Sequence, residues 1–248
     1  MQIEMDESPR TRNYLLAALP YDEYARFAPL FEHVHAVHGE TVARAGQRID
    51  YAYFPLTGMI SVVALMSEGL GVEVATVGNE GMIGLPVLFG GDTTPFDVMW
   101  QIEGEALRIR VNDLLTSVVE RGPLASVLMR YSLAFLFQTA QNGACNAVHT
   151  VSQRCARWLL STRDRTDGDS FFLTHEFLAF MLGITRQSTS LAVADFARRG
   201  IIAYQHGHMQ IVDRASLEVA SCECYRSIRA EFERLLEVGR GRARPASG

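Results

Sequence analysis

The chain has 248 residues, of which 48% are hydrophobic and 21% charged, and its formal net charge is −5 at pH 7. This composition is typical of a globular protein and excludes a disordered or fibrous one. No apolar run reaches the roughly 18 residues of a membrane-spanning helix, and no signal-peptide pattern begins the chain, so we expect a cytoplasmic protein without a membrane partner. The acidic balance does not exclude DNA, because a DNA contact needs only a local basic face.

The first half of the sequence predicts short helices followed by a small β-structure. Residues 11–32 carry apolar positions at helical spacing, interrupted by two prolines. From residue 33 to residue 111 the pattern changes to short β-branched segments, such as 59–65 and 72–77, with frequent glycines between them. Many short strands with closely spaced turns are typical of an antiparallel sandwich or roll. We expect about seven or eight strands within a sensory domain over residues 1–122.

Residues 124–148 contain no proline and predict a helix of roughly 37 Å, at 1.5 Å per residue. One row of positions alternates in steps of four and three: Leu124, Leu128, Tyr131, Phe135, Gln138, Asn142 and Cys145. A second, apolar row consists of Val127, Leu133, Leu136, Phe137, Ala140 and Ala144. A helix that is apolar on two sides packs on its own domain and on a second partner. We therefore expect residues 123–149 to pair two subunits in a homodimer, with a helix buried in a monomer as the alternative.

Residues 150–213 predict a compact unit with a helix-turn-helix at 173–202. Thr174 is a natural N-cap, Gly183 supplies the left-handed residue of a tight turn, and Thr185 caps a second helix. We expect the second helix to bury Thr189, Ala192, Val193 and Phe196. We expect it to expose Arg186, Gln187, Ser190 and Leu191. An apolar hairpin over 201–212 follows and completes a winged helix.

An exposed polar face at the start of the second helix is what a DNA-recognition helix requires. Arg186 is suited to a bidentate pair with guanine and Gln187 to one with adenine. Ser190 would add a contact, while hydroxyls at the helix starts, those of Thr174, Thr185 and Ser188, would hold phosphates. Double-stranded DNA is therefore the expected partner. The alternative is a module that senses a ligand or a protein partner without reading DNA. The exposed Leu191 favours this alternative.

The order of roll, long helix and winged helix-turn-helix resembles the Crp/Fnr family of transcription regulators, over roughly residues 20–213. The residues that carry the resemblance are Thr174, Gly183, Thr185, Arg186 and the run Gly200-Ile201-Ile202. The resemblance implies an α+β fold, with an N-terminal antiparallel β-roll (a jelly roll of the cyclic-nucleotide-binding type), a long dimerisation helix and a C-terminal winged helix-turn-helix. It also implies a homodimer on a palindromic site, contacts with RNA polymerase and an effector sensed in the roll.

The segment 78–91 is similar to the family's phosphate-binding cassette but departs from it at the key positions. Leu85 stands where the family's cyclic-AMP binders have a ribose-binding glutamate, and Thr93-Thr94 stand near their phosphate-binding arginine. Without a cation, a buried phosphate lacks its main charge partner, so we do not expect cyclic AMP. The effector is unknown or absent. Its expected pocket comprises Gly84, Leu85, Thr93, Thr94, Ala140 and Gln141, the last two replacing the family's adenine-contacting pair.

The remaining cysteines and histidines predict no cofactor. The pair Cys222 and Cys224 lacks a second close pair, and the family's N-terminal iron–sulfur cysteines are missing, so we expect reduced structural thiols and no metal. His33 and His35 with Glu40 suggest a cupin-type metalloenzyme. However, no later histidine in the roll completes such a site, so we expect surface histidines and no enzyme.

The C-terminal segment, residues 214–248, predicts one helix from about 214 to 238 and then a disordered tail. This segment extends beyond the family's minimal architecture. The sequence assigns no role to the two cysteines within it.

Overall fold

The computed structural model describes residues 9–67, 71–119, 122–166 and 168–236. Four short N-terminal segments come first: α1 (Pro9–Arg12), α2 (Tyr14–Ala17), α3 (Tyr21–Phe27) and the 3-10 turn η1 (Ala28–Leu30). They pack on the larger body, with Leu15 and Leu16 fully buried. Asn13 fixes this arrangement, because its side-chain amide donates to the carbonyls of Pro55 (2.9 Å) and Gly81 (3.0 Å).

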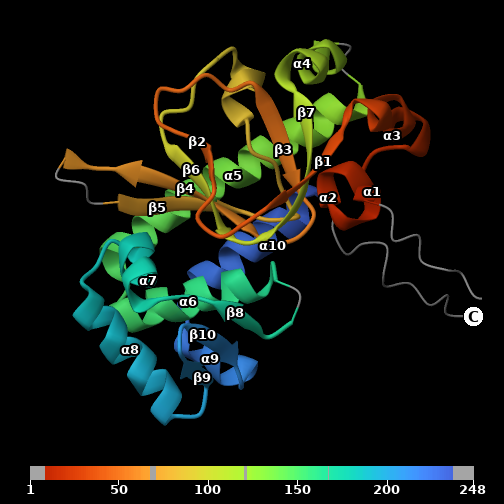
Figure 1. The fold of residues 1–248 in the computed structure, drawn as a ribbon. Helices are drawn as coiled ribbons and strands as arrows, with labels where there is room; N and C mark the ends of the chain where they lie inside the picture. Colours follow the sequence, from red (N-terminus) through yellow and green to blue (C-terminus); the bar gives the residue numbers. More distant parts are fainter. Residues whose placement is uncertain (1–8, 68–70, 120–121, 167, 237–248) are drawn as a thin grey trace, which may run out of the picture.

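Two antiparallel sheets follow and form the predicted roll (Figure 1). The strands are β1 (Glu32–Ala36), β2 (Thr41–Ala43), β3 (Tyr51–Pro55), β4 (Met59–Leu65), β5 (Gly71–Val77), β6 (Asp97–Ile102) and β7 (Gly104–Arg110). Their order is β1-β7-β3 in one sheet and β2-β6-β4-β5 in the other. These seven strands in the described residues agree with the predicted seven or eight.

Strand β4 is apolar on both faces because it separates two cores. Ile60 and Val62 point into the interior of the roll, whereas Met59 and Val63 join the core of the C-terminal unit. Side chains alternate across a strand, so this distribution follows from a continuous apolar run in the sequence. The turn η3 (Leu85–Phe89) lies between β5 and β6, within the segment that is similar to the cassette.

Helix α5 (Pro123–Val148) follows α4 (Val111–Val119) and agrees with the predicted long helix to within one residue. It runs along the roll in Figure 1 and ends at His149. Thr150 then caps α6 (Val151–Arg163) in a capping box with Gln153. Only two residues separate the long helix from the C-terminal unit.

The C-terminal unit contains β8 (Ser170–Phe172), α7 (His175–Leu182), α8 (Arg186–Arg198), β9 (Ile202–Gln205) and β10 (His208–Ile211). Its sheet has the order β8-β10-β9, so the predicted hairpin is part of a three-stranded wing. Strand β8 was not predicted, because three residues that alternate exposed, buried, exposed carry almost no pattern.

The C-terminal segment differs from the prediction of a single helix. It forms α9 (Arg214–Ala220) and α10 (Cys224–Leu236), separated where Ser221 adopts an extended conformation. Helix α10 turns back along α5 (Figure 1), and its residues Phe232, Leu235 and Leu236 join the core of the roll. Asp213 caps the start of α9, which agrees with the predicted start near residue 214, but the helical spacing alone did not reveal the stop at Ser221. The predicted disordered tail lies outside the described residues.

Among the described residues, no single helix is long and apolar enough to cross a bilayer, and only the α7–α8 pair, bent by 112°, passes the same test as a broken span.

Candidate nucleic-acid interface and effector cavity

The helix-turn-helix is built by the local caps that the sequence predicts. The Thr174 hydroxyl accepts a hydrogen bond from the backbone N–H of Phe177 (3.2 Å) and so caps α7. Gly183 ends α7 in the left-handed conformation, with φ of 62°. Thr185 caps α8 by accepting from the backbone N–H of Ser188 (3.2 Å). Both helices therefore begin at hydroxyl side chains, and the Thr185 hydroxyl also lies 2.9 Å from that of Ser188.

The two faces of α8 differ as expected. Its inner face is buried in the core of the unit: Thr189, Ala192, Val193 and Phe196. On its outer face Gln187 and Leu191 are exposed, and the Arg186 side chain retains 67% of its accessible surface. Arg186 pairs with Glu176 of α7 (Nε–Oε1 3.1 Å). A surface ion pair contributes only about 0–1 kcal/mol, so this contact orients the guanidinium without preventing it from leaving for a base.

Ser190 is half-buried rather than exposed, because His175 covers it. The ring Nδ1 of His175 lies 2.9 Å from the Ser190 hydroxyl, and the same ring stacks on Tyr204 of β9 at 4.5 Å between centroids. Burial, with the nearby Arg186, lowers the pKa of His175. His175 thus contacts both α8 and the wing, and its ring holds the Ser190 side chain in place.

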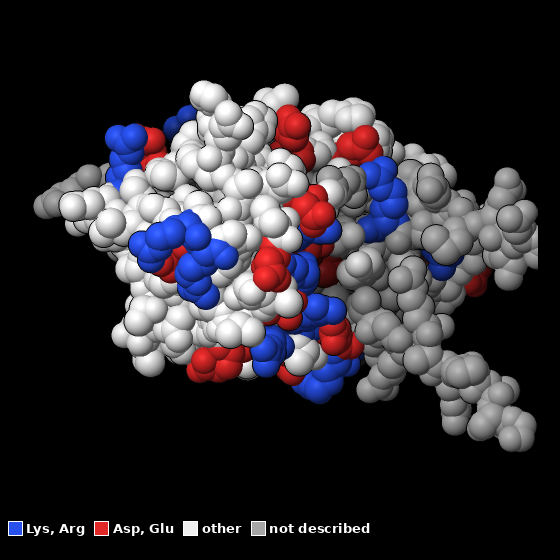
Figure 2. All heavy atoms as spheres, turned by 90° about the horizontal axis from the view of Figure 1, so that it is seen from below, with Lys and Arg blue, Asp and Glu red and all other residues white. Residues whose placement is uncertain are grey.

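The outer face of α8 is not uniformly basic. Arg198 and Arg199, at its end, both form ion pairs with Asp195. Seen from below, basic and acidic side chains lie next to one another instead of forming an unbroken basic surface (Figure 2). The wing turn carries His206 at φ of 50° beside Gly207. The start of α8 is therefore the best placed part of this surface for a phosphate or a base, since the helix dipole favours anions there.

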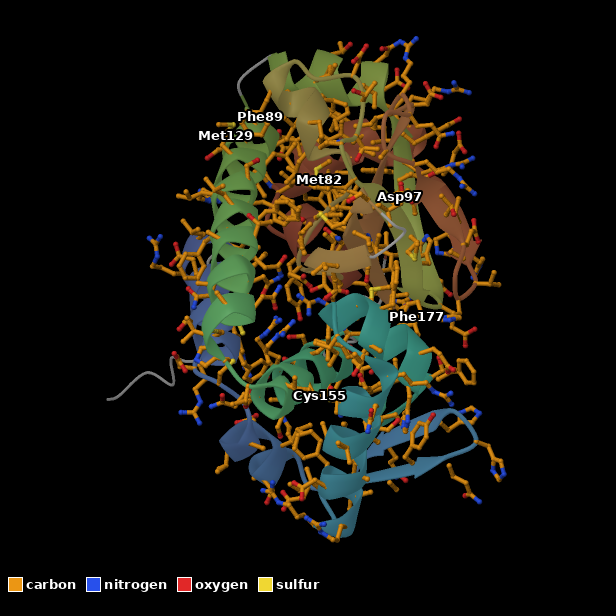
Figure 3. The ribbon with its side chains drawn as sticks, turned by 90° about the vertical axis from the view of Figure 1, so that its left-hand side faces the viewer. Met82, Phe89, Asp97, Met129, Cys155 and Phe177 are labelled. Carbon is orange, nitrogen blue, oxygen red and sulfur yellow. The ribbon has the colours of Figure 1, made fainter. Side chains whose placement is uncertain are left out.

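A cavity of about 740 Å³ lies between the roll and α5. Gly84, Leu85 and Thr94, three of the six predicted pocket residues, line it. Its other walls are mostly apolar, and α5 contributes Ser132, Phe135, Leu136 and Thr139. Met82 also lines the cavity and lies between α5 and the sheets, whereas Met129 lies on the outer side of α5 (Figure 3).

The other three predicted pocket residues lie elsewhere. Thr93 is exposed and pairs through its backbone with Arg48. Ala140 is exposed on the far side of α5, and Gln141 donates a hydrogen bond to the sulfur of Cys224 (3.1 Å). Successive helical residues are about 100° apart, so Thr139 faces the cavity while the next two positions turn away from it.

The cavity is poorly equipped for a phosphate. Among its described lining residues, Arg48 alone carries a positive charge, and it lies exposed beside Asp50 (3.6 Å). The hydroxyl of the buried Thr94 already bonds to the carbonyl of Phe96 (2.9 Å). A buried phosphate would therefore lack a charge partner within the cavity.

The structure changes the predicted surroundings of the histidines of β1 and of the cysteines. His33 and His35 share one face of β1, as expected, but the carboxylate next to both is Glu105 (3.3 and 3.6 Å), not Glu40.

Three of the four buried cysteines meet near His149: Cys145, Cys222 and Cys224. The spacing of Cys145 and His149, four residues apart on one helix face, is the signal that the sequence interpretation passed over. A hydrogen bond from Cys222, with the charge of Arg157, lowers the pKa of Cys145.

The roll and the C-terminal unit meet in a tightly packed interface that contains buried charges. A Cβ atom at Gly71 of β5 would lie 2.0 Å from the Phe180 ring of α7. Glu80 of the cassette forms a largely buried ion pair with Arg165 (2.7 Å). Glu73 is buried and accepts from Ser61 (2.7 Å), and its burial raises its pKa to about 7. The two halves are therefore energetically coupled.

Comparison with known families places each half of the chain. The Crp-like helix-turn-helix domain matches residues 153–220, and the cyclic nucleotide-binding domain matches residues 33–119. The CRP-like cAMP-activated global transcriptional regulator of Mycobacterium tuberculosis is 24% identical over 186 residues, which cover 72% of this chain and 83% of that protein. The Crp-like helix-turn-helix model and the Mycobacterium relative point to a transcription regulator rather than to the cupin-type metalloenzyme.

Solved structures show the same fold. FixK2 from Bradyrhizobium japonicum superposes with a TM-score of 0.66 at 17% identity, covering 77% of this chain and 98% of that one. The c-di-GMP responsive global regulator CLP from Xanthomonas campestris superposes with a TM-score of 0.62 at 18% identity, covering 77% and 99%. The predicted order of β-roll, long helix and winged helix-turn-helix is confirmed.

Proposed function

Because the chain belongs to the Crp/Fnr family of transcription regulators, we propose that it binds double-stranded DNA sequence-specifically as a homodimer in the cytoplasm and contacts RNA polymerase. The observation that carries this proposal is the start of α8. There Arg186 and Gln187 are exposed directly after a capped helix end, on a helix whose opposite face is buried. Residues 150–213 would be the DNA-binding unit, residues 1–122 the sensory domain and residues 123–149 the dimerisation helix.

In the proposed complex, the first turn of α8 enters the major groove. Arg186 leaves Glu176 and donates two hydrogen bonds to a guanine, while Gln187 pairs with an adenine. The O–H groups of Thr174 and Thr185 donate to phosphates, with Ser188 beside Thr185 (2.9 Å). Ser190, whose hydroxyl is held by His175, adds a further contact with the DNA. A protein-binding role without DNA would not need an exposed guanidinium and amide at the start of α8.

An exposed apolar stripe on α5 supports the homodimer. Its residues are exposed and follow one another in steps of four and three: Met129, Leu133, Leu136, Ala140, Gly143 and Ala147. Met129, Leu133 and Leu136 each expose more than half of their surface. This spacing is that of a two-stranded coiled coil, and the small residues at the end of the stripe would let two helices approach closely. Val127, which was predicted for this row, is buried in the core of the roll instead, and Phe137, also predicted for it, is half-buried beside the stripe.

We also infer that the effector, where one acts, is an apolar small molecule. The cavity has apolar walls and no buried cation among its described residues. Leu136 lines this cavity and also belongs to the exposed stripe of α5. A molecule seated against Phe135 and Leu136 would therefore act on the dimer seam directly.

The test of the proposal is selection from a random duplex library by the purified protein at physiological salt, without added ligand. We expect enrichment of a palindrome whose half-sites lie about one helical turn apart, roughly 10 base pairs. Enrichment of a sequence without two-fold symmetry would contradict the homodimer. A folded dimer that enriches nothing, in the presence or absence of the small-molecule fraction of a cell extract, would contradict DNA reading itself.

A further inference from the structure

The cluster of Cys145, His149, Cys222 and Cys224 is a set of metal-ligating side chains from two distant parts of the chain. Cys145 and His149 lie one turn apart at the end of α5, and the other two cysteines flank the start of α10. One potential ligand atom from each residue lies within 4.8 Å of all the others. All three cysteines are buried and form a separate small core.

From this arrangement we propose that the four side chains bind one zinc ion in a tetrahedral Cys₃His site. The distances fit a single ion. The sulfurs of Cys145 and Cys222 lie 3.5 Å apart, and the sulfur of Cys224 lies 3.6 Å from Nδ1 of His149. Zn–S bonds of about 2.3 Å and Zn–N bonds of about 2.0 Å in a tetrahedron give separations of about 3.8 Å and about 3.5 Å. An iron–sulfur cluster forces some of its ligands farther apart, because several atoms lie between them.

The surroundings of the cluster favour a metal over a group of free thiols. Nε2 of His149 lies 3.2 Å from the Glu223 carboxylate, which holds the proton on that nitrogen and leaves the Nδ1 lone pair directed at the cluster. Metal-binding histidines usually donate the N–H of their other ring nitrogen to such a carboxylate. The amide of Gln141 donates to the Cys224 sulfur (3.1 Å), a contact that would also stabilise a thiolate there.

Charge also fits. Three thiolates and a divalent ion leave one negative charge in a buried place. Arg154 and Arg157 are both buried on α6, next to the cluster, and the Nε atom of each has no hydrogen-bond partner among the described residues. The cationic side chains thus lie where an anionic zinc site needs them. The ion would fasten the α9–α10 connection to the junction of α5 and α6.

The direct test is the metal content of the full-length protein, purified without a polyhistidine tag and measured by plasma mass spectrometry. We expect one zinc ion per chain. Cys145→Ser and Cys222→Ser should lose it, whereas Cys155→Ser should keep it. Cys155 is the matched control, because it is equally buried in α6 but lies outside the cluster.

A second variant keeps the test sharp if the cysteine variants misfold. The Glu223 side chain is 73% exposed, so Glu223→Gln should leave folding intact. It should weaken zinc binding by about 10- to 100-fold in competition with a chelator, whereas Glu233→Gln, on the exposed side of α10, should not. Cobalt in place of zinc should give thiolate charge-transfer absorption. Wild-type protein that lacks zinc, forms a Cys145–Cys222 disulfide instead, or contains iron with sulfide would overturn the proposal.

Discussion

The C-terminal unit and the roll have the same fold as their relatives, but their functional surfaces are specified in different ways. At the helix-turn-helix, the residues that matter are close in sequence: Thr174 caps one helix, Gly183 turns the chain and Thr185 caps the next. The cavity of the roll is assembled from strands, the cassette and α5. A recognition surface built from adjacent residues can therefore be located from the sequence, whereas a pocket built from distant segments depends on tertiary packing.

The largest effect we expect comes from the helix that joins these regions. Replacing Leu133 and Leu136 together by glutamate places charge in the exposed stripe of α5 and should give monomers by light scattering. Because one half-site would then bind alone, affinity for a palindromic site should fall by about 100- to 10,000-fold. Leu65→Glu is the control, since Leu65 is an exposed leucine of β4 outside the stripe. A double variant that remains dimeric would show that α5 is not the dimer seam.

The next largest effect is a pH dependence of stability that arises from Glu73, at the interface between the roll and the C-terminal unit. The folded-state pKa of Glu73 is raised by burial to about 7 from 4.5. A carboxyl group whose pKa is raised stabilises the fold below its unfolded pKa, and this stabilisation is lost as the pH rises through 7. The difference corresponds to about 3 kcal/mol as an upper bound. Denaturant titrations should therefore show the free energy of unfolding falling between pH 5 and pH 8.

Glu73→Gln should remove this part of the pH dependence and be the more stable protein at pH 8. Glu103→Gln, at an exposed position, should leave the profile unchanged. If Glu73→Gln retains the wild-type slope, the coupling between the roll and the C-terminal unit does not pass through this carboxyl group.

The smallest effect we expect is that of cyclic AMP on the melting temperature, because the roll lacks the family's phosphate-binding arginine. A ligand at 1,000 times its Kd stabilises a protein by about 4 kcal/mol, which raises Tm by roughly 10 °C in a chain of this size. Millimolar cyclic AMP should leave Tm unchanged, because the cavity offers no buried cation for the phosphate among its described residues. A rise of several degrees that depends on cyclic AMP concentration would contradict our interpretation of Leu85 and Thr94.

Much of the architecture could be predicted from the sequence because it rests on local periodicity. The helix of residues 124–148 and both caps of the helix-turn-helix are examples. The phase of a helix relative to its neighbours is not local. Ala140 and Gln141 were placed in the pocket by resemblance, whereas the structure directs Thr139 there. Nothing in the sequence near α5 shows that α10 packs along it and takes Gln141 as a partner.

The cysteine cluster escaped prediction for the same reason. The interpretation treated Cys222 and Cys224 as an isolated pair, since their partners lie more than 70 residues earlier in the chain. The predicted single helix over residues 214–238 also hid the break at Ser221, which is what turns these two cysteines toward α5. Each of the two helix ends carries only two of the four potential ligands, and only tertiary packing brings the two pairs together.

The most direct test of the central claim, that α8 reads DNA, is the affinity of Arg186→Ala for the selected site and for its single-base variants. Our account predicts a loss of about 1–3 kcal/mol, roughly 10- to 100-fold, and the loss of discrimination at one symmetric position of each half-site. Arg198→Ala, which removes an arginine already paired with Asp195, should change affinity only slightly and keep discrimination. Unchanged affinity of Arg186→Ala, with discrimination retained at every position, would contradict the account.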